Sequence, residues 1–160
     1  MARPVLLNSC ARAATTAEAK FRIDYPLAAS RATRVLALDA GAVDVVRSVS
    51  ESSWNHARFY VASAADGLEL TTVGGDEVAL AGELDGVDAF IMVATDDDGA
   101  PSAAMIGAAC SVRGVMTAGL VISSDRVTSE ALIALRPHAR ILLAPADEED
   151  LFELLKAIRA

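Results

Sequence analysis

Apolar and polar residues alternate along this chain in a pattern that predicts short strands separated by helices. Short apolar runs bounded by turn-forming residues are typical of buried strands. Five such runs occur, at residues 35–38, 58–62, 89–94, 116–122 and 141–144, and residues 68–73 alternate between apolar and polar as a sixth short strand would. The run at 89–94 is apolar throughout, which is typical of a central parallel strand covered on both faces.

Apolar residues recur at helical spacing between these runs. Val43, Val46 and Val49 predict a helix after the first strand. Further helices are predicted at residues 78–84, 103–112 and 128–135, and a last one begins at the acidic segment 147–150. The helix at 103–112 consists almost wholly of small apolar residues. We therefore expect that helix to be buried.

Strands that alternate with helices form a parallel sheet with helices on both faces. We predict an α/β fold with a doubly wound, mostly parallel, six-stranded sheet in the order 3-2-1-4-5-6, a Rossmann-like three-layer α/β/α architecture. Residues 34–160 form this single domain, and residues 1–33 are an N-terminal extension, because basic residues outnumber acidic ones only before residue 34. We expect the extension to pack on the domain or on a neighbouring copy, which makes a homo-oligomer the expected state.

Composition and charge restrict the partners. The 160 residues suit one domain, and the net charge of −8 opposes binding to nucleic acid and to anionic membranes. The most apolar stretch, residues 103–122, is interrupted by Arg113, so no transmembrane span is predicted. Cys10 and Cys110 lie far apart and indicate no disulfide framework, which favours a reducing, cytoplasmic location.

Ligands of doubly wound sheets bind beyond the carboxyl ends of the strands, where the strand order reverses. That rule points to two loops, residues 39–42 and 95–102. We predict that they form an acidic cleft for a small polar or cationic ligand. The candidate ligand-binding residues are Asp39, Ala40, Gly41, Thr95, Asp96, Gly99, Ser102 and Ser123. Taken singly, Asp39 is a better candidate for a helix N-cap than for a ligand contact.

Three consecutive acids in the second loop make a divalent cation a candidate cofactor. At most one of Asp96, Asp97 and Asp98 can cap the following helix, so the others are solvated charges or oxygen ligands for magnesium or calcium. A nucleotide is the other candidate cofactor, although the first loop offers only Gly41 and no Walker sequence occurs. Bare phosphate beside three carboxylates would need a bridging metal.

No catalytic set is evident in the sequence. Cys110 falls in the apolar helix and is predicted to be a core residue. His56 and His138 are predicted away from the carboxyl edge of the sheet. Ser102 and Ser123 lie at that edge, but no G-x-S-x-G elbow surrounds them.

The order of these pieces resembles the nucleotide-binding half of the FtsZ/tubulin family. Residues 34–65 are similar to the first two strands of that family, and residues 84–94 to its fourth strand and the segment before it. Residues 95–109 fall at the phosphate loop and its helix. Residues 114–122 and 139–151 are similar to the fifth and the sixth strand. The resemblance implies a Rossmann-like fold. Segments 39–42 and 96–103 keep only Gly41 and Gly99 where the family has glycine-rich loops, so we do not expect GTPase activity to carry over.

Three functions are consistent with the sequence. The first is a small-ligand-binding module that uses the acidic cleft. The second is an enzyme or nucleotide-binding protein in which backbone amides at the start of the helix near Ser102, assisted by a metal on Asp96 or Asp98, hold phosphate. The third is a structural or oligomerisation protein with a vestigial cleft, which assembles through the extension and an alanine-rich face.

Overall fold

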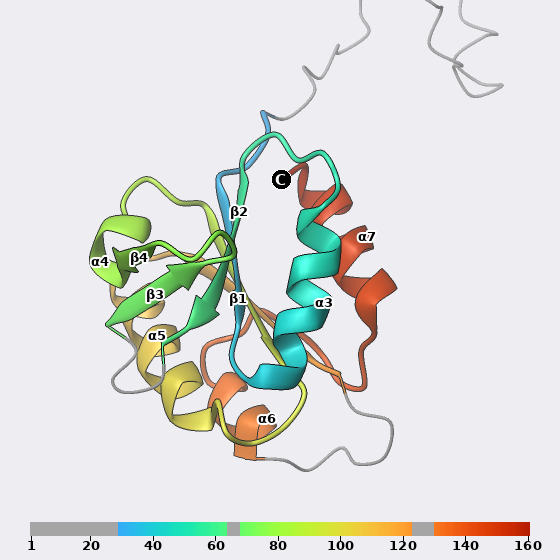
Figure 1. The fold of residues 1–160 in the computed structure, drawn as a ribbon. Helices are drawn as coiled ribbons and strands as arrows, with labels where there is room; N and C mark the ends of the chain where they lie inside the picture. The colour runs from blue at the N-terminus through green and yellow to red at the C-terminus, as the bar shows by residue number, and fades with distance from the viewer. Residues whose placement is uncertain (1–28, 64–67, 123–129) are drawn as a thin grey trace, which may run out of the picture.

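A computed structural model of the chain describes residues 29–63, 68–122 and 130–160 (Figure 1). The strands are β1 (Thr33–Ala37), β2 (Ala57–Ala62), β3 (Glu69–Thr72), β4 (Glu77–Ala79), β5 (Ala89–Ala94), β6 (Met116–Val121) and β7 (Ile141–Leu143). The helices are α3 (Ala40–Ser50), α4 (Leu80–Glu83), α5 (Ala100–Val112), α6 (Glu130–Leu135) and α7 (Glu148–Ile158). Ser123 and nearly all of the predicted extension lie outside the described residues.

The strands form one sheet in the order β4-β3-β2-β1-β5-β6-β7. β2, β1, β5, β6 and β7 are parallel, whereas β3 and β4 are antiparallel additions at one edge. The predicted α/β class with a mostly parallel sheet is confirmed, and the six predicted strands have the predicted order. Counted alone, the parallel strands follow the order 2-1-3-4-5, the flavodoxin-like form of the doubly wound fold.

The seventh strand, β4, replaces the start of a predicted helix. Residues 78–84 were predicted to be helical, but Val78 lies in β4 and the helix begins only at Leu80. The reason is the turn that precedes it: Gly75 has a φ of 101°, which lets the chain reverse and pair β4 with β3. Sequence periodicity alone cannot distinguish a short hairpin strand from a first helical turn.

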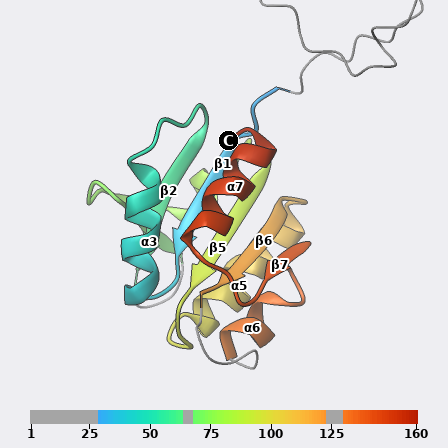
Figure 2. The same cartoon turned by 90° about the vertical axis from the view of Figure 1, so that its right-hand side faces the viewer.

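Helices cover both faces of the sheet, as Figures 1 and 2 show. On one face, α3 and α7 pack against Val35, Ile91 and Leu120. On the other face, α4, α5 and α6 pack against alternate strand residues such as Leu36 and Phe90. Every residue of β5 is buried, as expected of a central strand.

Only one side of α5 is buried. Ala103, Ile106 and Cys110 face the sheet, so the prediction of a buried helix is correct for that side. The outward side, however, is exposed, including Met105 at 37% and Val112 at 86% exposure. The prediction failed there because no further layer of the described chain covers this helix.

None of the helices in the described parts of the chain is long and apolar enough to cross a membrane.

Candidate functional site

The strand order reverses between β1 and β5, and the space between the loops that follow them is the switch-point crevice. Asp39 follows β1 almost directly and caps α3 by accepting a hydrogen bond from the backbone amide of Ala42 at 2.9 Å. Its carboxylate also accepts from the backbone amides of Thr95 (2.7 Å) and Asp96 (3.2 Å) and from the Thr95 hydroxyl. One side chain therefore joins the start of α3 to the end of β5.

These contacts leave Asp39 little capacity for a ligand. An ionised carboxylate offers about four acceptor positions, and four donors of the protein already point at it. Asp39 is also buried, at 8% exposure. The N-cap favoured by the sequence is observed, and the same carboxylate additionally fastens the two loops together.

Two glycines bring the loops into contact. A Cβ atom added to Gly41 would lie 2.1 Å from Thr95 Oγ1. A Cβ atom added to Gly99 would lie 2.5 Å from Leu38 Cβ and 2.7 Å from the Leu38 carbonyl oxygen. Real side chains do not tolerate such distances, so both positions require glycine for the approach of the loops rather than for phosphate.

Two of the three consecutive acids accept hydrogen bonds from the backbone, each from a different residue. Asp96 accepts a hydrogen bond from the backbone amide of Asp98 at 2.8 Å, and Asp97 accepts from the backbone amide of Ala131, at the start of α6, at 3.0 Å. The described residues contain no group of three or more His, Cys, Asp or Glu side chains placed to hold a metal ion. Metal binding by Asp96, Asp97 and Asp98 stays a prediction, and the structure gives two of them a role in holding the loop.

A cavity of about 450 Å³ lies beside the crevice, toward β2; we call it the Asp98 pocket. Its lining residues are Leu38, Asp39, Ala40, Val43, Val61, Ala62, Ser63, Asp98 and Ser102. Three predicted ligand-binding residues, Asp39, Ala40 and Ser102, therefore share one cavity. Four others, Gly41, Thr95, Asp96 and Gly99, instead belong to the loop contact described above.

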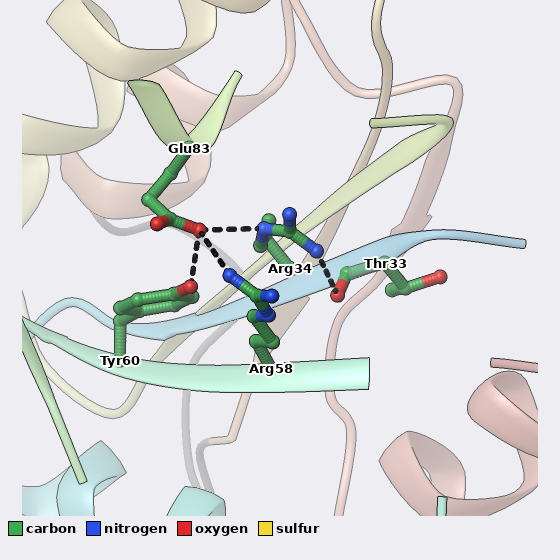
Figure 3. Close-up of polar contacts among 5 residues, drawn as sticks. All are labelled: Thr33, Arg34, Arg58, Tyr60 and Glu83. Carbon is green, nitrogen blue, oxygen red and sulfur yellow. Dashed lines mark hydrogen bonds and ion pairs between the residues drawn. The ribbon is translucent and has the colours of Figure 1, made fainter. Parts of the chain in front are cut away.

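A second polar constellation, the Glu83 cluster, was missed by sequence reasoning (Figure 3). Glu83 is the last residue of α4, and its Oε2 atom accepts hydrogen bonds from Arg34 Nε (2.8 Å) and from the Tyr60 hydroxyl. The same oxygen lies 3.8 Å from an Arg58 guanidinium nitrogen. The cluster holds α4 against β1 and β2, because Arg34 and Glu83 are almost completely buried and need each other as partners.

The sequence contained a signal for this cluster. In the parallel register of β1 and β2, Arg34 lies opposite Arg58 and Leu36 lies opposite Tyr60. Two arginines side by side on one face of a sheet require an acid nearby. The sequence alone does not show that Arg34 and Arg58 are neighbours, because the register of β1 and β2 is known only from the fold.

The candidate nucleophiles do not meet at the crevice. Cys110 is fully buried, and burial raises the pKa of its thiol to about 11, so the reactive thiolate is not formed at neutral pH. His56 and His138 precede β2 and β7, and so lie at the amino edge of the sheet. Both placements agree with the sequence analysis.

No protein-family model and no curated protein matches this chain. Among solved structures, the chain is similar to a protein of Burkholderia pseudomallei described as pilus assembly-related. The two share 14% sequence identity with a TM-score of 0.43, over 84% of this chain and 95% of that one. This likeness carries no functional conclusion. The resemblance to the FtsZ/tubulin family stays a prediction.

Replacing Asp39 with Asn should destabilise the fold. Asparagine keeps the size of the side chain but loses the charge and turns an NH₂ group toward backbone N–H donors, so we expect the free energy of unfolding to fall by about 2–4 kcal/mol. Urea denaturation measures this. Asp44→Asn, at an exposed position on α3, is the control and should change stability by less than about 0.5 kcal/mol. Equal stability of the two variants would contradict the role of Asp39.

Alkaline pH should weaken the Glu83 cluster. Burial, with a further contribution from the hydrogen bond to Glu83, raises the pKa of Tyr60 from 10.0 to about 12, although Arg34 and Arg58 oppose the shift. The unfolded chain therefore loses the phenol proton first, so the stabilisation is complete below pH 10 and is lost as the pH rises toward 12. In Tyr60→Phe, the free energy of unfolding, measured from pH 9 to 12, should fall less steeply with pH than in the wild-type protein. An equally steep fall in both proteins would refute this assignment.

Proposed function

We propose that this chain is an interaction module, a doubly wound domain that contacts another protein surface through the outward side of α5. The observation that carries the proposal is the exposed, uncharged surface formed by Pro101, Ala104, Met105, Ala108 and Val112, which we call the α5 face. The hydrogen bonds of Asp39 support the same proposal, because the carboxylate at the usual ligand position of this fold is already satisfied by the protein itself.

The α5 face is unusual for a helix on the outside of a domain. A surface helix normally carries charged residues on the side away from the core. The thirteen residues of α5 include none, and Val112 is 86% exposed. Ile133, on the neighbouring α6, is also 67% exposed. An exposed apolar helix face of this kind supports a role in binding another macromolecule.

Site-specific photo-crosslinking in cells tests whether the α5 face is a contact surface. A photoreactive amino acid placed at Ala108 should give a covalent adduct with a protein, because that position lies at the centre of the face. The same amino acid at Ala157, an exposed alanine on α7, is the control and should give little or none. No adduct at Ala108, or equal adducts at both positions, would refute the proposal.

A small cationic ligand in the Asp98 pocket is the second candidate function. It is supported by the cavity of about 450 Å³, a size that suits a small molecule, and by Asp98, which is exposed and has no side-chain partner among the described residues. Ser63 and Ser102 add hydroxyl groups to the same lining. An amine could pair with Asp98 without displacing any observed hydrogen bond.

Thermal unfolding with putrescine, spermidine and choline tests this second candidate. A bound amine at a hundred times its dissociation constant should add about 2.7 kcal/mol of stability, visible as a higher Tm. The increase should disappear in Asp98→Asn and persist in Asp44→Asn. No increase with any amine would refute the pocket as a cation site. The same measurement is made with GTP and magnesium. A higher Tm only when both are present would instead favour nucleotide binding.

A further inference from the structure

We infer that the partner of the α5 face is a second copy of this chain, packed with its α5 antiparallel to the first about a two-fold axis. This inference rests on the proposed function, because it requires the α5 face to be a contact surface. It goes further by naming the occupant and its orientation.

Charge complementarity determines the orientation. Asp98 lies just before α5 and Arg113 just after it, and the helix between them has no charged residue. Both side chains are exposed, and neither forms an ion pair within the described parts of the chain. An antiparallel pair brings Asp98 of each copy to Arg113 of the other, and the two-fold axis makes this contact twice. A parallel pair would instead bring like charges together.

The charge of the whole chain favours a self-contact at α5 over one elsewhere. With a net charge of −8, two copies repel each other over most of their surfaces. Exposed acids such as Asp44 on α3 and Glu149 and Glu153 on α7 would face one another in contacts made through the opposite side of the sheet. The α5 face is a surface on which two copies can meet without bringing like charges together.

The side chains of the α5 face are complementary in size under the same symmetry. An axis that passes midway between Met105 and Ala108 places Met105 of each copy against Ala108 of the other. It also places Pro101 opposite Val112. Alanines at 104 and 108 allow two helices to approach to about 8 Å, the short end of the usual range. Methionine is flexible enough to fill the remaining space.

The size of the contact sets its expected strength. A helix of thirteen residues is about 20 Å long. Two such faces bury less than the ~800 Å² per partner that stable complexes bury. We therefore expect a reversible dimer with a Kd on the order of micromolar rather than an obligate one.

Sedimentation equilibrium of the full-length purified chain, from about 1 to 500 µM, measures this association. Wild type should convert from monomer to dimer over that range. Ala108→Glu should raise the Kd at least tenfold, because it places two carboxylates at the contact, while Ala157→Glu should not change it. Circular dichroism confirms that each variant is folded. A monomer throughout, or a dimer indifferent to Ala108→Glu, would overturn the inference.

A charge exchange tests the antiparallel orientation. Asp98→Lys and Arg113→Glu should each weaken the dimer, because each creates two like-charged contacts. The double variant should restore the wild-type Kd, because it exchanges the charges without changing their complementarity. Additive weakening in the double variant would overturn the orientation.

The outcomes separate this inference from the function on which it rests. If the purified chain is monomeric but Ala108 still forms a photo-adduct with a different protein in cells, self-pairing is wrong and the contact function stands. If neither a dimer nor an adduct forms, both are wrong. An adduct of twice the mass of the chain supports both.

Discussion

The rest of this structure depends on the hydrogen bonds that the buried Asp39 carboxylate accepts. A buried carboxylate is costly unless hydrogen-bond donors compensate for the lost water. Here the donors come from α3 and from the loop after β5, which are far apart in sequence. Satisfying Asp39 therefore fixes both loops at the switch point, and the glycines at 41 and 99 are required so that the loops can come close enough.

The same principle operates at the opposite end of β1. There Glu83 is held by Arg34 and Tyr60, and it ties α4 to the central strands. β1 is thus fastened by a carboxylate near each end, with an apolar core between them. Both carboxylates are occupied by the protein's own groups. Besides the Asp98 pocket, the surfaces that stay available for function are the outward sides of helices. Among the helices of the described residues, α5 is the one without a charged residue.

The sequence predicted most of the architecture because strand order in a doubly wound fold follows from general rules of connection. It could not predict which role Asp39 takes. Its partner Thr95 is 56 residues away, and capping and ligand binding use the same residue type at the same position. The exposure of Val112 could not be predicted either, because the sequence of an apolar helix does not show whether one side of it is buried or both. Arg34 and Arg58 became informative only through the register of β1 with β2.

Amide hydrogen exchange at Thr95 tests the central claim most directly. If Asp39 holds the switch point closed, the Thr95 amide should exchange as slowly as the amides of β5, with an opening free energy close to that of global unfolding. In Asp39→Asn, the Thr95 amide should exchange much faster than the amide of Ile91 in the middle of β5. Fast exchange of Thr95 in the wild-type protein would contradict the account, because the loops would then open independently of the fold.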